Sequence, residues 1–173
     1  MRVFLACLPP PGCLPRLAQW QRAMQREAGG RCLPLPQLHL TLAFLGELGP
    51  LALQRAADCA ERAAADLPAS LTLDCLGSWE GGIGWCAPAA ADAALQAWVM
   101  ALRRDLRAQG LRLDAQPFRP HLTLLRKLRQ PLPLQTVPPL RLALRELALI
   151  ASSLSADGAR YQRLDGWRGG AAR

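Results

Sequence analysis

The sequence predicts an α+β fold with two lobes, each of them an antiparallel β-sheet covered by helices. Segments with strand-like alternation and with helix-like periodicity follow one another in the order β-α-β-α-β-β-α-β-β-β. The tetrapeptide His-Leu-Thr-Leu occurs at 39–42 and again at 121–124, nearly half a chain length later. Because a helix precedes each copy, we expect a pseudo-twofold axis that relates two lobes within a single domain of residues 1–173.

The individual elements follow from apolar periodicity and from the glycines that end them. Gly29-Gly30 and Gly110 close two helices, and Gly81-Gly82 makes the turn of a hairpin. The expected helices cover 11–26, 51–67 and 89–109. The expected strands cover 2–8, 38–45, 71–76, 83–86, 121–126, 141–152 and 161–164, the last two joined through Asp157-Gly158.

The composition fits a protein with a packed core and no membrane segment. Of the 173 residues, 51% are hydrophobic. No run reaches the roughly 18 apolar residues that a membrane-spanning helix needs. The apolar N-terminal segment is too short for a signal peptide and is ended by prolines. We therefore expect a monomer in the cytoplasm, without a membrane partner.

The charge and the cysteines indicate what kind of ligand and which compartment to expect. The formal net charge of +8 comes almost entirely from arginine, since Lys127 is the only lysine. A field of that sign attracts phosphate groups. The six cysteines include no CxxC pair, so the spacing of a zinc site is missing. We expect isolated, mostly buried thiols in a reducing compartment.

The paired tetrapeptides carry the chemistry. In a strand, residues i and i+2 point to the same face, so each motif presents an imidazole and a hydroxyl on one side and two leucines on the other. His39 and His121 are the only histidines of the chain. They suit a general acid and a general base. Thr41 and Thr123 suit donors to the non-bridging oxygens of a phosphodiester.

Two other kinds of site fit poorly. Two imidazoles lack the third and fourth ligands of a metal centre, and no carboxylate or cysteine at helical or hairpin spacing completes a set. The sequence has no GxSxG elbow, which disfavours a serine hydrolase. We therefore expect no metal and no cofactor.

The flanks of both motifs resemble the two signatures of the 2H phosphoesterase superfamily. The resemblance extends over 31–47 and 118–126. The opening 2–6 and the closing 161–164 are similar to the bacterial RNA 2′,3′-cyclic phosphodiesterase branch, once called 2′-5′ RNA ligases. Cys32 departs from the family, in which many relatives have tryptophan.

The resemblance implies a bilobal α+β fold with the active site in the central cleft. It implies hydrolysis of RNA 2′,3′-cyclic phosphate ends, or of cyclic nucleotides, to 2′-phosphomonoesters. By this resemblance His39 and His121 are the catalytic pair, Thr41 and Thr123 bind phosphate, and Arg126 contacts phosphate. We assign His39 as proton donor and His121 as proton acceptor. The alternatives are 2′-5′ RNA ligation at the same site and a non-catalytic RNA-end-binding module.

Several flanking residues have two interpretations. Phe118 is either a platform that stacks on an RNA base or an apolar anchor before Pro120. Arg119 faces either RNA phosphate or solvent. Residues expected to have structural roles are Trp79 and Trp85 in packing, Glu47 in a solvated turn, and Arg103, Arg104 and Arg107 on a solvated helix face.

Overall fold

The computed structural model describes residues 2–155 and 158–170 of the chain. These residues form an α+β fold with antiparallel strands, as predicted. The strands are β1 (Arg2–Cys7), β2 (Arg31–Cys32), β3 (Leu40–Glu47), β4 (Ser70–Trp79), β5 (Ile83–Ala87), β6 (Leu122–Arg126), β7 (Gln135–Ala143), β8 (Glu146–Ser155) and β9 (Gly158–Arg168). The α-helices are α1 (Leu14–Ala28), α2 (Pro50–Ala64) and α3 (Ala93–Ala108), and 3-10 turns lie at Pro11–Cys13 and Leu35–Gln37.

The two motif strands join the halves of the molecule. One half has the strand order β7-β4-β5-β6 and the other β3-β1-β8-β9, while β2 pairs with β6. The halves meet at β3 and β6, whose recorded pair is Leu40 with Leu122. The two predicted sheets are therefore hydrogen-bonded to each other as one nine-stranded sheet, because the motif strands that end each half pair directly.

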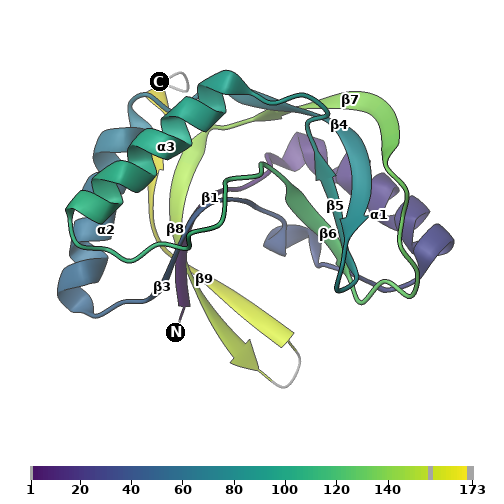
Figure 1. The fold of residues 1–173 in the computed structure, drawn as a ribbon, viewed down its shortest axis with the longest axis horizontal. Helices are drawn as coiled ribbons and strands as arrows, with labels where there is room; N and C mark the ends of the chain where they lie inside the picture. The colour runs from purple at the N-terminus through teal and green to yellow at the C-terminus, as the bar shows by residue number, and fades with distance from the viewer. Residues whose placement is uncertain (1, 156–157, 171–173) are drawn as a thin grey trace.

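The helix that precedes each motif packs on the other half of the sheet. Helix α1 comes before β3 in the chain but contacts β6. Helix α3 comes before β6 but contacts β3, and α2 lies beside it (Figure 1). This exchange gives each motif strand a helix from the opposite repeat, so neither half has its complete core alone.

After Arg2, strand β1 is apolar and buried on both of its faces. Val3, Leu5 and Cys7 belong to the main core. Phe4 and Ala6 face the other side and form a second cluster with Ala148, Ile150 and the packed ring of Tyr161. This second cluster forms part of the floor beside the first motif, so the continuous apolar run at the N-terminus serves both the core and the site.

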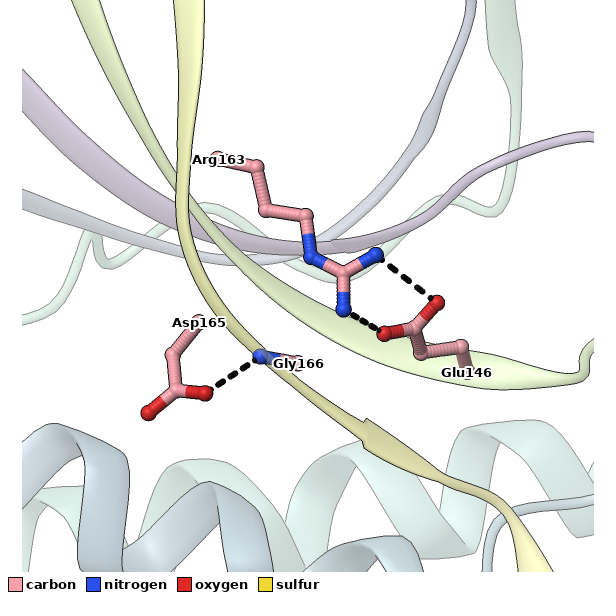
Figure 2. Close-up of polar contacts among 4 residues, drawn as sticks. All are labelled: Glu146, Arg163, Asp165 and Gly166. Atoms are coloured by element: carbon pink, nitrogen blue, oxygen red, sulfur yellow. Dashed lines mark hydrogen bonds and ion pairs between the residues drawn. The ribbon is translucent and has the colours of Figure 1, made fainter.

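Strands β8 and β9 form a long two-stranded ribbon (Figure 1). The guanidinium of Arg163 donates two hydrogen bonds to the carboxylate of Glu146 (Figure 2). The bond from Nη1 to Oε2 is 3.1 Å long. Asp165 accepts a hydrogen bond from the backbone N–H of Gly166 at 2.8 Å. The bidentate geometry fixes the position of β9 relative to β8. Tyr161 lies two residues before Arg163 in β9.

The sequence prediction was wrong at β7. The segment 141–152 was expected to be one strand, but β7 ends at Ala143 and β8 begins at Glu146. Strand β7 also includes Pro138 and Pro139. An edge strand tolerates proline because one row of its N–H groups has no neighbour to bond, and β7 is the edge of its half. The two-residue strand β2 was also not predicted. The turn residue Asp157 lies outside the described residues.

The prediction of isolated, mostly buried thiols was confirmed. All six cysteines are free, and only Cys32 is half-buried while the other five are buried. Burial raises the pKa of the Cys7 and Cys86 thiols to about 12. Thiols in such surroundings stay protonated and behave as small apolar side chains.

Candidate active site

The pairing of β3 with β6 brings the two motifs together face to face. Leu40 pairs with Leu122, and both side chains are fully buried. His39 and Thr41 flank Leu40, and His121 and Thr123 flank Leu122, so this one pair brings the two motifs side by side in the sheet. All four polar side chains are half-buried, on the face opposite the leucines. The pairing thus gathers two imidazoles and two hydroxyls on one face of the sheet.

Both imidazoles are oriented by the same local hydrogen bond. The Nδ1 atom of His39 lies 2.7 Å from the carbonyl oxygen of Gln37, and Nδ1 of His121 lies 2.7 Å from the carbonyl oxygen of Arg119. A carbonyl can only accept, so Nδ1 carries the proton and donates it. In the neutral ring, Nε2 is then the unprotonated nitrogen that can accept or return a proton. The two motifs present the same tautomer.

Aromatic rings hold each imidazole in place, and they differ between the motifs. The His39 ring centroid lies 4.8 Å from that of Phe4 and 5.3 Å from that of Tyr161. The His121 centroid lies 4.5 Å from that of Trp79, in an edge-to-face arrangement. Trp79 in turn packs on Trp85, with centroids 5.5 Å apart. The packing roles expected of the two tryptophans therefore include direct support of His121.

Two long polar side chains, one on α1 and one on α3, donate hydrogen bonds to the backbone of the motif strands. Gln21 on α1 is buried and donates from Nε2 to the carbonyl oxygens of Leu33 at 2.8 Å and Leu124 at 2.9 Å. Arg103 on α3 donates from Nε to the carbonyl oxygen of Leu42 at 3.1 Å. Leu124 and Leu42 each lie three residues after the histidine of their motif. The prediction of a solvated Arg103 was wrong, because α3 packs against β3 and directs this side chain inward.

Burial and like charge both lower the histidine pKa values. Burial is the largest cause for His39, and the positive charges of His121 and Arg126 lower its pKa further, against the opposing hydrogen bond to Gln37. For His121, burial again lowers the pKa most and Arg126 adds to it, against the hydrogen bond to Arg119. Both imidazoles are therefore more readily neutral than free histidine, and a bound anion would favour their protonated forms.

A pocket of about 850 Å³ opens on the same face and is lined by residues of β3, β1 and the β8–β9 ribbon, and also by residues 31–34 and Arg126. Its lining includes His39, Thr41 and Arg126. His121 and Thr123 of the second motif do not line the pocket. Further residues that line the pocket are Arg2, Phe4, Arg31, Phe44, Glu47 and Tyr161. The pocket is thus asymmetric and belongs to the His39 side.

The structure decides between the two interpretations of Phe118 and shows the positions of Arg119 and Glu47. Phe118 is only 7% exposed, and the guanidinium of Arg103 lies 5.7 Å from its ring centroid. It is an apolar anchor and has no free face for an RNA base. Arg119 is exposed and supplies the carbonyl that orients His121. Glu47 is exposed at the end of β3 and lines the pocket.

Sequence reasoning missed two residues from distant strands, Phe4 and Tyr161, and also the nearby Gln37. Phe4, Gln37 and Tyr161 all line the pocket near His39. Gln37 also donates from Nε2 to the carbonyl oxygen of Ala159 at 3.1 Å, which ties the first motif to β9. The only signal in the sequence was that Phe4 and Tyr161 lie in the opening and closing segments that resemble the family.

The described residues, 2–155 and 158–170, include no metal-ligand cluster and no membrane-spanning helix. In that part of the chain, no group of three or more His, Cys, Asp or Glu side chains could hold a metal ion. None of the helices there has the length and apolar character needed to span a membrane.

The fold and the site define a protein with paired His-x-Thr strands at the centre of an antiparallel sheet. The chain belongs to the 2′-5′ RNA ligase superfamily, whose family model matches residues 9–155. The RNA 2′,3′-cyclic phosphodiesterase of Escherichia coli K12 is 29% identical over 171 residues, covering 96% of this chain and 95% of the relative. A solved phosphoesterase structure matches with a TM-score of 0.83 and 29% identity, covering 97% of each chain. LigT of E. coli complexed with 3′-AMP matches with a TM-score of 0.82 and 29% identity, also over 97% of each chain.

Proposed function

We propose that the protein is a metal-independent RNA 2′,3′-cyclic phosphodiesterase that produces 2′-phosphomonoesters. The observation that carries this proposal is the pairing of β3 with β6 at Leu40 and Leu122, which brings the two His-x-Thr motifs together in the sheet. The relative from E. coli, which bears this activity in its name, supports the same substrate class. Binding alone would not require two titratable groups at one point.

The proposed reaction is an in-line displacement at phosphorus. Nε2 of His121 takes a proton from water as the water oxygen forms its bond to phosphorus. Nε2 of protonated His39 gives its proton to O3′ as the P–O3′ bond breaks, which leaves a 2′-phosphate and a free 3′-hydroxyl. Thr41 and Thr123 donate hydrogen bonds to the non-bridging oxygens, and Arg126 balances their charge.

The pocket supports this assignment of acid and base. In an in-line attack the ribose lies on the leaving-group side of phosphorus, opposite the incoming water. The pocket that could hold a nucleoside lies on the His39 side. The histidine beside the ribose is the one that reaches O3′, so His39 is the proton donor and His121 the proton acceptor.

A turnover assay in a chelator tests the proposal. We expect hydrolysis of a cyclic mononucleotide to persist in excess EDTA, with ³¹P NMR showing a 2′-phosphate product. Loss of turnover in EDTA and its return with a divalent ion would refute the metal-independent mechanism. A 3′-phosphate product would refute the assigned regiochemistry. Adding an RNA with a free 5′-hydroxyl tests for 2′-5′ joining, since a hydroxyl can replace water as nucleophile.

We also propose that the enzyme acts as a monomer in the cytoplasm. Six free cysteines, most of them buried, fit a reducing compartment. Size-exclusion chromatography with light scattering tests the oligomeric state directly.

A further inference from the structure

The pocket continues well beyond the two motifs along the half-sheet of β3, β1, β8 and β9. Thr41 pairs with Ala6, and at the far end of β1 Arg2 pairs with both Glu47 and Ser152. Ala6 and Arg2 are four residues apart, or about 13 Å at the rise of a β-strand. Arg2, Glu47 and Ser152 all line the pocket. The pocket thus runs from the phosphate-binding end to a polar row at its far end.

An exposed aromatic side chain lies between these ends. Phe44 is 38% exposed, pairs with Phe4 across β3 and β1, and lines the pocket. Most phenylalanines are buried, and a free ring beside a phosphate site is suited to stack on a base. The neighbouring polar groups can form hydrogen bonds with ribose, phosphate or base edges, since Arg2 donates, Glu47 accepts and Ser152 does both.

The pocket continues past the place that the terminal ribose and phosphate would take. If O3′ of the terminal nucleotide is next to His39, its ribose lies by the rings of Phe4 and Tyr161, which contact His39. Phe44 and the Arg2 row lie further along. The pocket volume of about 850 Å³ is near the upper end of the roughly 300–1,000 Å³ range of ligand sites.

We propose that Phe44, Arg2, Glu47 and Ser152 form a subsite for the ribonucleotide that precedes the cyclic-phosphate end, with its base stacked on Phe44. The substrate is then the 3′ end of an oligoribonucleotide, in preference to a free cyclic mononucleotide. Because stacking accepts any base, the subsite discriminates by chain length and not by sequence. The inference rests on the function proposed above and adds the substrate's minimum length.

The test compares a cyclic mononucleotide with a dinucleotide that ends in the same cyclic phosphate. One stacked base contributes about 1–3 kcal/mol, so wild type should favour the dinucleotide by roughly 5- to 150-fold in kcat/KM. Phe44→Ala should reduce this ratio to near 1, and Phe44→Tyr should preserve it. Leu51→Ala, which removes an exposed apolar side chain from α2 outside the pocket, is the matched control and should leave the ratio unchanged.

Two results would overturn the subsite. The first is a wild-type ratio near 1. The second is an equal loss for both substrates in Phe44→Ala, which would mean that Phe44 supports the site or the terminal base. Dissociation constants of the 2′-phosphate products, mono- and dinucleotide, give the same ratio without turnover. If wild type hydrolyses neither substrate, the proposed function is wrong, and the ratio of dissociation constants still decides the subsite.

Discussion

Gly77→Ala should impair the second motif through a chain of aromatic contacts. Gly77 on β4 pairs with Trp85 on β5, and Trp85 pairs with Thr123 on β6. A Cβ at position 77 would lie 2.6 Å from Cζ2 and 2.7 Å from Cη2 of Trp85. Carbon atoms in good contact are about 3.5–4.0 Å apart, so the indole must move by roughly 1 Å. Trp85 is 9% exposed and cannot simply swing into solvent.

The displaced indole transmits its shift toward His121. Trp85 packs on Trp79, which contacts the imidazole of His121. Overpacking of this kind costs about 1–3 kcal/mol, which lowers Tm by roughly 2–12 °C in a domain of this size. A misplacement near 1 Å in a reacting group can cost up to about 100-fold in rate. We expect kcat/KM to fall by roughly 10- to 100-fold for any cyclic phosphodiester substrate.

The assay measures kcat/KM and Tm for Gly77→Ala beside a matched control and a rescue variant. Gly12→Ala adds a Cβ with no atom within 4 Å and should behave as wild type. Trp85→Phe in the Gly77→Ala background removes the colliding ring atoms. It also removes the indole N–H, which is buried without a hydrogen-bond partner among the described residues. Activity should recover in this double variant. A Gly77→Ala protein with a lowered Tm and wild-type kcat/KM would show that Trp85 and Trp79 do not position His121.

Three further predictions concern the chemistry at the motifs. His39→Ala and His121→Ala should each lower kcat by roughly 10²–10⁴ while Tm changes little, because the leucine faces stay intact; a collapse of Tm would indicate structural histidines. Thr41→Val or Thr123→Val removes a hydrogen bond to a charged oxygen, about 1.5–3 kcal/mol, and should lower kcat/KM by roughly 10- to 150-fold without changing the shape of its pH profile. The pH profile of wild-type kcat/KM should be bell-shaped. The positive charge of Arg126 lowers the pKa of both imidazoles, so Arg126→Gln should raise both pKa values and move both limbs of the profile to higher pH. Limbs that stay at the same pH in this variant would contradict the coupling.

The paired motifs were predictable because their information is local. The two-residue period of a strand places Leu40 and Leu122 in the core and leaves the histidines and threonines on the other face, and the structure has this arrangement. The N-terminal strand and the buried thiols were predictable for a similar reason, since a run of apolar residues or an isolated cysteine carries its own preference for burial.

The surroundings of the imidazoles were decided by tertiary structure. Tyr161 reaches His39 across more than a hundred residues of chain, because β1 lies between β3 and β8 in the sheet order and β9 follows β8. Trp79 reaches His121 because β5 brings β4 close to β6. Such contacts depend on strand order and register, which no short sequence pattern specifies.

The sequence by itself determined which residues carry the proposed chemistry, and the tertiary structure decided what surrounds them. Phe118 was left with two interpretations, and only the folded position of α3 brings Arg103 over its ring. The near-identical motifs likewise could not distinguish His39 from His121. In the structure their surroundings differ, because His39 lines the pocket and His121 does not. Local periodicity fixes the face to which a side chain points, whereas its neighbours come from parts of the chain that only folding brings together.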